Sequence, residues 1–571
     1  MKRFILTLAL LLAGVLAARA VPAYPRPVTV VQPDGSTVVI QLHGDENFHW
    51  ITDETGEYMA RDEQGFLRRV SKAEIDARAA SAPFKGSFRR NYEPQRSSSI
   101  SLGERKFLVV LIEFSDLSFK KSRQDFYNLT NQVGYNGTGS VYDYYTFQSQ
   151  GKLQPEWDVF GPVKVSGKMA DYGGNDYSGN DKNPDGLLAE ALKLIDSQVN
   201  YKDYDNDGDG YVDNVFYFFA GYSAAEGGGD DCIWPHEWSL RANYSSLVLD
   251  GVRFDSYACA SELTGTKGSN ITGIGACCHE LGHALGLPDF YDTNYYTNGQ
   301  AEYTPGPFSL MDAGCYNNDS RTPPNLSAME RYMLEWMEEP ETLGQTGPYS
   351  LESITSNTAY MLPSDVNGEY FIFETRDGTG WDAYINTYFP STPVQGLVVY
   401  QVDQSNNKVS GNTRASSLWN YGNKINAFAS HPCYRIIPAK DSYRHDRWVF
   451  PCGTITEYTP EAWSEKQLDY TLRDISFSDG KVSFTLAGPE SSGIGIKLIR
   501  SPKKYYSVGD VFTFSLSTDG DAATSVKWYF DGSRTSDPSV TLLSKGAHTV
   551  KAIVGYADSS TEEIERVIIV Q

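Results

Sequence analysis

Cysteine, histidine and basic residues are all scarce in this sequence of 571 residues. There are seven cysteines, an odd count that excludes complete pairing, although Cys433 and Cys452 are near enough in sequence to close a loop. Lysine and arginine total 49 against 72 aspartates and glutamates, which gives a formal charge of −23. Because an acidic surface repels phosphate backbones, this composition argues against nucleic acid as a partner.

Long hydrophobic runs are absent beyond the start of the chain. After residue 20, no segment is apolar over the roughly 20 residues that a membrane-spanning helix needs. The start contains a shorter apolar run, ILTLALLLAGVLA, which follows Lys2 and Arg3 and ends at Ala18-Arg19-Ala20. This order is typical of a secretory signal peptide. We therefore expect residues 1–20 to be a signal peptide, and the mature protein to be secreted or held at the cell surface without a membrane span.

The composition that remains is that of a folded protein with many β-strands. Hydrophobic residues make up 40% and charged residues 21%, which excludes disorder of the whole chain. The aromatic fraction of 13%, together with 51 glycines and 27 prolines, suits twisted sheets joined by tight turns. The length predicts several domains.

Residues 21–100 have the pattern of a small β-rich module followed by a linker. The string VTVVQPDGSTVVIQL predicts a hairpin around Pro33-Asp34-Gly35. The module ends in FRRNYEPQRSSSISLGER, whose arginines are Arg89, Arg90, Arg96 and Arg105. A basic, serine-rich stretch with little apolar content predicts an exposed linker that proteases can cut.

Residues 101–345 alternate between strand and helix patterns. KFLVVLIEFSDL and NVFYFFAGY are continuous apolar runs, which predict strands covered on both faces. DGLLAEALKLID has a helical apolar stripe, and a second helix is expected from Asn270 to about Leu287. A capping box, Ser327-Ala328-Met329-Glu330, predicts the start of a further helix.

The remainder of the chain predicts two β domains. Residues 346–490 contain short strands and turns, with GEYFIFETR and QGLVVYQVD the clearest, and predict a β-sandwich or a β-barrel, of which the β-sandwich is favoured. In residues 491–571 hydrophobic side chains alternate at period two, as in Val526, Trp528 and Phe530, which predicts an immunoglobulin-like (PKD-like) sandwich.

The strongest chemical signal is CCHELGHALGLPDF, which contains His279, Glu280 and His283 in the pattern HExxH. Residues four apart on a helix lie one above the other, so both imidazoles can present a ring nitrogen to one zinc ion. Glu280 is then positioned to act on a water molecule as a general base. The apolar residues of the same segment recur at helical spacing, which predicts a half-buried helix and argues against a polar surface helix that carries these histidines by chance.

Gly286 and Asp289 extend this motif. Glycine can adopt the left-handed conformation that ends a helix, so the chain can turn back and bring Asp289 to the ion, and Pro288 prevents the helix from resuming. Glu302 is an alternative third ligand at a plausible distance in sequence, but AEYTPGPF is a poor helix former. Asp289 is the favoured ligand.

The string HExxHxxGxxD resembles the elongated zinc motif of the metzincins, with aspartate in place of the usual third histidine. Together with GSVYDYYTFQSQGKL, DYDNDGDGYVDNVFYFFAG, IWPHEWSL, SLMDAG and GEYFIFETRDGTGWD, it resembles the immune inhibitor A family of secreted metallopeptidases. The resemblance spans about residues 106–403. It implies an α+β zincin-type catalytic domain with His279, His283 and Asp289 as zinc ligands and Glu280 as base.

Two further roles follow from the same resemblance. Met311, in SLMDAG, corresponds to the methionine of a Met-turn beneath the zinc site. Tyr316 is a candidate for stabilising the transition state by its position after that turn, although a tyrosine there can equally serve packing alone.

A second metal site is predicted in DYDNDGDGYVD. Alternate carboxylates of Asp205, Asp207 and Asp209 around a glycine turn, with Asp213 after them, offer the hard oxygen ligands that calcium prefers. The loop is not an EF-hand, because Phe216 stands where the bidentate glutamate would be. The alternative is a solvated acidic turn.

Other residues near these motifs are not expected to take part in catalysis or metal binding. His236, in IWPHEWSL, is expected to be a hydrogen-bonded core histidine and not a ligand. Cys277 and Cys278 cannot form a cysteine–histidine dyad with His279, since neighbours one or two positions apart point to different faces of a helix.

The sequence therefore predicts a secreted zinc endopeptidase, made as a latent precursor, that acts on protein or peptide substrates with Zn²⁺ and a calcium ion bound. No cysteine lies in residues 21–100, so a thiolate cannot block the zinc; His43 and His49 are weak candidates for that role. The alternative is a secreted adhesin whose metal site is only structural, although three protein ligands favour an open, catalytic site. The sequence does not indicate an oligomeric state.

Overall fold

The computed structural model describes most of the chain. The described residues are 19–81, 100–175, 180–420, 423–488, 494–499, 508–518, 523–536, 538–544, 546–557 and 560–570. Residues 1–18 of the expected signal peptide, and Arg89, Arg90 and Arg96 of the expected linker, lie outside the described residues.

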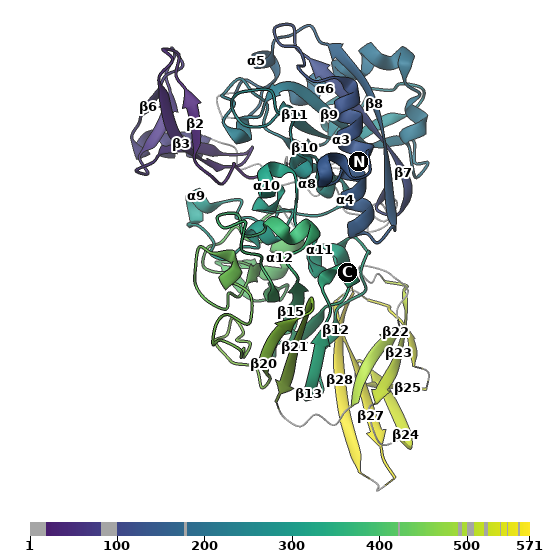
Figure 1. Cartoon of the computed structure of the whole chain (residues 1–571). Helices are drawn as coiled ribbons and strands as arrows, with labels where there is room; N and C mark the ends of the chain where they lie inside the picture. Colours follow the sequence, from purple (N-terminus) through teal and green to yellow (C-terminus); the bar gives the residue numbers. More distant parts are fainter. Residues whose placement is uncertain are drawn as a thin grey trace, which may run out of the picture.

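A five-stranded antiparallel sheet forms the N-terminal unit, drawn in purple in Figure 1. The hairpin expected around Pro33–Gly35 is present, with Val31 opposite Thr37. The elements in chain order are β2 (Val28–Val31), β3 (Thr37–Gly44), β4 (His49–Asp53), β5 (Tyr58–Arg61), β6 (Leu67–Arg69) and α1 (Lys72–Ser81).

The next unit is built on a six-stranded sheet of order β1-β10-β11-β9-β7-β8. Its strands are β1 (Arg19–Ala20), β7 (Gly103–Glu113), β8 (Leu153–Lys164), β9 (Tyr211–Tyr222), β10 (His236–Trp238) and β11 (Arg253–Leu263). β8, β7, β9 and β11 run parallel to one another, whereas β10 pairs antiparallel with both β11 and β1. The two predicted apolar strands are β7 and β9, at the centre of this sheet.

Successive side chains of β7 and β9 enter two different cores. Leu108 and Val110 face one core, whereas Phe107 and Val109 face the other. Helices therefore cover both faces, as continuous apolar strands require. α6 (Pro184–Ile195) and α7 (Leu240–Tyr244) contribute to one side, and α3 (Arg123–Asn131), α4 (Val141–Gln148) and α8 (Ile274–Leu285) to the other.

The predicted helices are present, with one boundary in error. α6 covers DGLLAEALKLI, and the capping box at Ser327 and Glu330 opens α11 (Ala328–Met333). The helix expected from Asn270 begins instead at Ile274, because Ile271 pairs with Leu263 at the end of β11. The shorter helices of this unit are α5 (Met169–Tyr172), α9 (Tyr295–Asn298) and α10 (Asn317–Ser320).

Two sheets that share one hydrophobic core follow, and the assignment of this unit as a β-sandwich domain stays a prediction. One sheet has the order β12-β14-β15-β16-β19 and the other β13-β21-β20. The elements are β12 (Glu341–Thr342), β13 (Gly347–Leu351), β14 (Tyr360–Pro363), β15 (Glu369–Arg376), β16 (Gly396–Asp403), β19 (Tyr434–Ile436), β20 (Thr471–Ser478) and β21 (Lys481–Ala487). A small hairpin, β17 (Lys408–Ser410) with β18 (Thr413–Arg414), and α12 (Ala415–Asn420) lie between β16 and β19.

The C-terminal unit also contains two antiparallel sheets around a core of its own. Its strands are β22 (Ile494–Ile499), β23 (Val511–Thr518), β24 (Ser525–Phe530), β25 (Ser533–Thr535), β26 (Ser539–Thr541), β27 (Gly546–Gly555) and β28 (Thr561–Val570). The alternating residues Val526, Trp528 and Phe530 lie on β24, so the period-two pattern did mark a strand. That the fold is immunoglobulin-like stays a prediction.

Two expectations about the whole chain can be compared with the structure. All seven cysteines are buried free thiols, so the suggested Cys433–Cys452 bridge is wrong. Within the described ranges, no helix combines the length and the apolar character needed to cross a bilayer.

Candidate metal centre

Helix α8 and the turn after it position the HExxH side chains. α8 ends at Gly286, whose φ of 111° lies in the left-handed region that glycine tolerates. The backbone N–H of Leu287 then donates to the Gly282 carbonyl at 2.9 Å, which turns the chain back along the helix. This sharp reversal brings Asp289 beside the two histidines, as the motif predicted.

The three predicted zinc ligands converge on one point. His279 Nε2 and His283 Nε2 are 3.1 Å apart, and Asp289 Oδ1 lies 3.1 Å from the first and 3.2 Å from the second. Each imidazole is oriented through its other nitrogen, because His279 Nδ1 lies 2.8 Å from the Leu310 carbonyl and His283 Nδ1 2.8 Å from the Leu287 carbonyl.

This arrangement fits a bound zinc ion. Three ligand atoms at about 2.0–2.2 Å from one ion, with tetrahedral angles, lie about 3.3–3.5 Å apart, close to the observed separations. Since Nδ1 of each histidine faces a carbonyl and carries the proton, both Nε2 lone pairs point at each other and at a carboxylate. Without a cation between them, these two lone pairs and the carboxylate would repel one another, so the arrangement favours a bound metal ion.

Glu280 lies beside this cluster and is fully buried. Its Oε1 accepts a hydrogen bond from the backbone N–H of Val21 at 2.9 Å, while Oε2 has no hydrogen-bond partner among the described residues. Burial, followed by the charge of Asp289, raises the pKa of Glu280 well above its usual range. A carboxyl group with a raised pKa is suited to exchanging a proton with a neighbouring group near neutral pH.

Asn423 holds the third ligand from a distant part of the chain. Its side-chain nitrogen Nδ2 donates to Asp289 Oδ2, and its side-chain oxygen Oδ1 accepts from the backbone N–H of Asp289 at 2.7 Å. The two residues are separated by 134 positions in sequence, and Asn423 belongs to the loop that follows α12. No pattern in the sequence pointed to this contact.

The N-terminal unit brings two further carboxyl groups to the site. Asp45 and Glu46 follow β3, and burial together with the charge of Asp289 raises the pKa of Asp45 to about 7. Burial, then the charges of Asp45, Asp289 and Glu280, raises the pKa of Glu46 well above normal. The sequence did not predict that this acidic pair lies near the metal centre, because the residues of a turn between two strands do not indicate which part of the protein the turn will contact.

The two histidines considered for blocking the metal have other contacts. His43 Nε2 lies 2.9 Å from the Thr52 hydroxyl and its ring stacks on Trp50. The ring of His49 stacks on Trp234, with 4.9 Å between centroids. The metal-ligating group found in the described part of the chain contains neither, so their candidacy is not supported.

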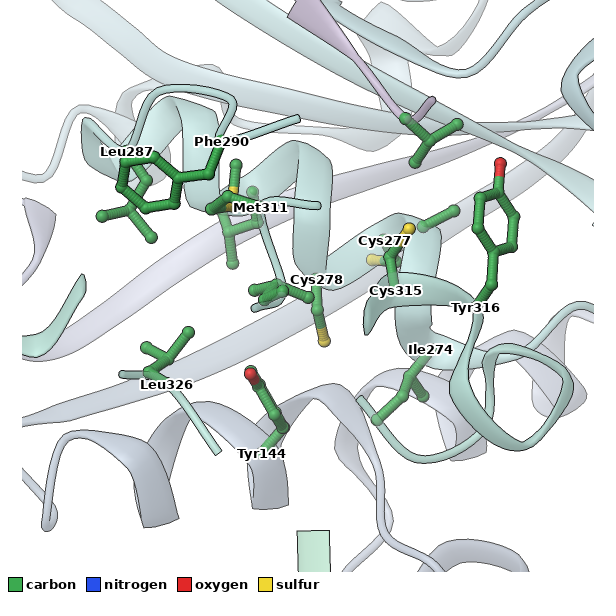
Figure 2. Close-up of a cluster of buried hydrophobic side chains, with 14 of the residues drawn as sticks. Tyr144, Ile274, Cys277, Cys278, Leu287, Phe290, Met311, Cys315, Tyr316 and Leu326 are labelled. Carbon is green, nitrogen blue, oxygen red and sulfur yellow. The ribbon is translucent and has the colours of Figure 1, made fainter. Parts of the chain in front are cut away.

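Met311 lies under the helix as a Met-turn residue would. Its carbonyl accepts from the backbone N–H of Phe290 at 2.8 Å, and a Cβ on Gly282 would come within 2.8 Å of its sulfur. Glycine at 282 therefore allows the methionine to pack directly against α8. Figure 2 shows Met311 in the same buried hydrophobic cluster as Cys277 and Cys278.

Two other predicted residues can be assigned from their contacts. Glu302 is exposed and absent from the metal-ligating group, so the alternative with Glu302 as third ligand is wrong. His236 is buried with Nδ1 2.6 Å from the Trp234 carbonyl and Nε2 2.8 Å from the Tyr257 hydroxyl. It is the hydrogen-bonded core histidine that the sequence analysis expected.

The aspartate-rich loop lies immediately before β9, a strand of the six-stranded sheet. Oxygen atoms of Asp205, Asp207 and Asp209 all lie within 4.8 Å of one another. Asp213 is not part of that group, because its Oδ2 accepts from the backbone and side-chain nitrogens of Asn206, at 3.0 and 3.1 Å. Three of the four expected calcium ligands are thus brought together, and the fourth instead holds the loop.

Comparison with known proteins finds relatives that match part of this chain. Immune inhibitor A of Bacillus thuringiensis subsp. alesti is 31% identical over 199 residues, covering 30% of this chain and 28% of that protein. Pre-pro-metalloprotease PrtV of Vibrio cholerae serotype O1 (strain M66-2) is 30% identical over 258 residues, covering 37% and 27%. The chain therefore matches less than a third of the length of these curated relatives.

A solved structure, OgpA from Akkermansia muciniphila, covers 82% of this chain and 94% of its own at 10% identity, with a TM-score of 0.23. So low a score supports no argument about function. The match to a protein family is more informative, because it falls on the part of the chain that contains α8, Asp289 and Met311. Residues 124–341 match the family described as immune inhibitor A peptidase M6, catalytic domain, so this part of the chain is similar to the catalytic domains of that family.

Proposed function

We propose that this protein is a secreted zinc endopeptidase that hydrolyses peptide bonds in proteins. The observation that carries the proposal is the triangle of His279 Nε2, His283 Nε2 and Asp289 Oδ1, whose sides are 3.1, 3.1 and 3.2 Å. The position of Glu280, one residue from the first ligand, adds the base that hydrolysis requires. Secretion rests on the signal-like first twenty residues, and the substrate class on the peptidase family.

The chemistry divides between the metal and this chain's own side chains. A zinc ion held by His279, His283 and Asp289 would polarise the substrate carbonyl group and would lower the pKa of a water molecule, so that the water could lose a proton near neutral pH. Glu280 takes the proton of the attacking water and passes it to the nitrogen of the leaving amine. Asn423 keeps the carboxylate of Asp289 aimed at the histidines, since it grips both the side chain and the backbone of that residue.

The precursor is latent in this proposal until the N-terminal unit is removed. His279, Glu280 and Asp289 are all completely buried, and His283 is 3% exposed. Val21 contacts Glu280, and the carboxyl groups of Asp45 and Glu46 lie close enough to Asp289 for its charge to raise their pKa values. A polypeptide substrate cannot reach the site while these residues occupy it, which is why we propose that activation requires a cut in the arginine-containing linker FRRNYEPQRSSSISLGER.

The test is proteolysis before and after cleavage of that linker. We expect the chain cut by trypsin after Arg89, Arg90 or Arg96 to digest denatured casein, and the uncut chain to digest it at least about tenfold more slowly. Dialysis against 1,10-phenanthroline should abolish the digestion, and one equivalent of Zn²⁺ should restore it, since the metal ligands persist. Digestion that survives complete removal of zinc would contradict the proposed function, and N-terminal sequencing of the products identifies the bonds cut.

We also propose that Asp205, Asp207 and Asp209 bind a structural calcium ion. Their carboxylates are close together, and Asp205 Oδ1 is a buried oxygen without a hydrogen-bond partner in the described part of the chain. Three negative charges at this separation repel one another unless a cation lies between them. The loop joins Tyr201–Tyr204 to β9, so an ion there would fasten the start of a central strand.

Calcium is accordingly expected to raise the melting temperature. At a concentration 100 times Kd, a ligand adds about 2.7 kcal/mol to stability, which corresponds to about 5–10 °C for a domain of this size. Differential scanning calorimetry in 1 mM CaCl₂ and in EGTA measures the shift. Asp207→Asn should reduce it, whereas Asp196→Asn, on a neighbouring exposed turn, should not. Identical melting curves with and without calcium would rule the site out.

A further inference from the structure

An extended segment of the chain itself crosses the metal centre. β1 pairs antiparallel with the edge strand β10, with Arg19 opposite Glu237 and Ala20 opposite His236. The segment continues past the site, and Ala20 and Val21 are 0% and 1% exposed. Arg19 and Ala20 belong to the predicted signal peptide. After processing, the positions of these two residues are therefore open to another polypeptide.

The peptide bond between Ala20 and Val21 lies between two side chains of the site. On one side, the N–H of Val21 donates to Glu280 Oε1 at 2.9 Å. On the other, the Ala20 carbonyl oxygen accepts a hydrogen bond from the hydroxyl of Tyr291 at 2.9 Å. A peptide bond about to be hydrolysed needs these same two contacts, one at the nitrogen that must be protonated and one at the oxygen that gains charge.

The next two carbonyl groups of the segment are also held. The Val21 carbonyl accepts from Trp234 Nε1 at 2.9 Å, and the Pro22 carbonyl accepts from the Tyr316 hydroxyl at 2.7 Å. These contacts go to backbone atoms, so they are available to a polypeptide of any sequence. Tyr316, the residue first considered for the transition state, therefore contacts the chain two residues beyond the bond that faces Glu280.

We propose that Tyr291 is a catalytic residue that donates its hydroxyl hydrogen to the carbonyl oxygen of the scissile peptide bond, and that Trp234 and Tyr316 hold the two carbonyl groups that follow. This inference rests on the proposed function and adds to it the register in which substrate lies. Tyr291 follows Asp289 by two residues, so the turn after α8 that fixes the third ligand also fixes the tyrosine.

The proposed step balances as follows. The oxygen of water bonds to the carbonyl carbon, its proton goes to Glu280, and the electron pair of the C=O bond moves onto the carbonyl oxygen. The hydrogen bond from Tyr291 stabilises the charge on that oxygen, which is larger than in the substrate. The C–N bond then breaks, the electron pair returns to restore the carbonyl, and Glu280 gives its proton to the departing nitrogen.

The test compares Tyr291→Phe with Tyr316→Phe in the processed enzyme. Each variant removes one hydroxyl from a buried tyrosine that contacts a carbonyl of the N-terminal segment. Tyr291→Phe is expected to lower kcat about 10²–10³-fold with KM nearly unchanged, because its contact strengthens as charge develops. Tyr316→Phe should chiefly raise KM. Zinc content and melting temperature, measured on both, exclude loss of the fold or of the metal.

A second readout does not depend on turnover. A phosphinic peptide, which carries a charged oxygen at the reacting position, should bind Tyr291→Phe more weakly by the same factor that kcat/KM falls. Its binding to Tyr316→Phe should weaken only as much as that of an ordinary peptide. Should Tyr291→Phe misfold, Tyr291→His keeps a donor and should retain part of the rate.

The outcomes separate this inference from the proposed function. If the wild-type chain digests casein and the kcat of Tyr291→Phe is within threefold of the wild-type kcat, the assignment of Tyr291 is wrong, whereas the proposed peptidase function stands. Unchanged binding of the phosphinic peptide to Tyr291→Phe would overturn it equally. If the processed wild-type protein shows no zinc-dependent hydrolysis, the proposed function itself fails.

Discussion

Glu280→Gln is expected to lower kcat for peptide hydrolysis by about 10²–10⁴-fold while zinc stays bound, because a general base contributes a factor of that size. Glutamine has nearly the same shape but cannot accept the proton of the attacking water. Glu280 lies beside the metal ligands but is not one of the three residues whose side chains converge on the proposed zinc position. The zinc content of the variant should therefore equal that of the wild type. Steady-state kinetics on a fluorogenic peptide and atomic absorption measure the two quantities.

The matched control is Glu156→Gln, which makes the same chemical change on β8 at an exposed position. It should leave both kcat and zinc content unchanged. A Glu280→Gln protein that hydrolyses peptides at the parental rate would mean that the metal site is only structural. That result would favour the other reading of the sequence, a secreted binding protein that retains a metal.

Asp289→Ala is expected to weaken zinc binding by more than about 100-fold, since loss even of a residue that only supports a ligand costs 10–100-fold. The variant should lose hydrolysis in proportion to the zinc it no longer holds, and added Zn²⁺ should restore part of the rate. Competition with a fluorescent zinc chelator gives Kd directly. The cause is geometric, because Asp289 Oδ1 is the third corner of the triangle with His279 and His283.

Glu302→Ala is the matched control for that experiment. It removes a carboxylate that the sequence alone allowed as an alternative ligand but that the structure leaves exposed. Its zinc affinity should equal that of the wild type. Equal loss of zinc in both variants, or retention of full affinity by Asp289→Ala, would contradict the ligand set proposed here.

The features predicted correctly from sequence are those that depend on neighbours within one turn or one strand. The spacing of His279 and His283 fixes their relation on α8, and Gly286 permits the turn that presents Asp289. The continuous apolar run of β9 and the alternation of β24 predicted their strands for the same reason. The start of α8 was missed because a pairing between Leu263 and Ile271 competes with the helix.

The features that the sequence did not reveal are contacts between distant segments. Asn423 grips Asp289 across 134 residues, and Tyr291 reaches Ala20 across 271. Asp45 and Glu46 enter the site from a turn of the N-terminal unit. None of these residues belongs to a sequence motif that indicates its role. Amide, hydroxyl and carboxylate side chains are common on protein surfaces, and their function here depends on the residues that pack against them.

The amino-acid sequence by itself determined that two imidazoles, a carboxylate and a glutamate would meet on one helix and the turn after it, because helical geometry is set by local backbone hydrogen bonds. Only the tertiary structure decided what surrounds that cluster: the amide that fixes the aspartate, the strand that lies across it and the tyrosine that contacts the strand's carbonyl. Those contacts depend on how whole domains pack, and packing is a property of the folded chain that no local pattern encodes.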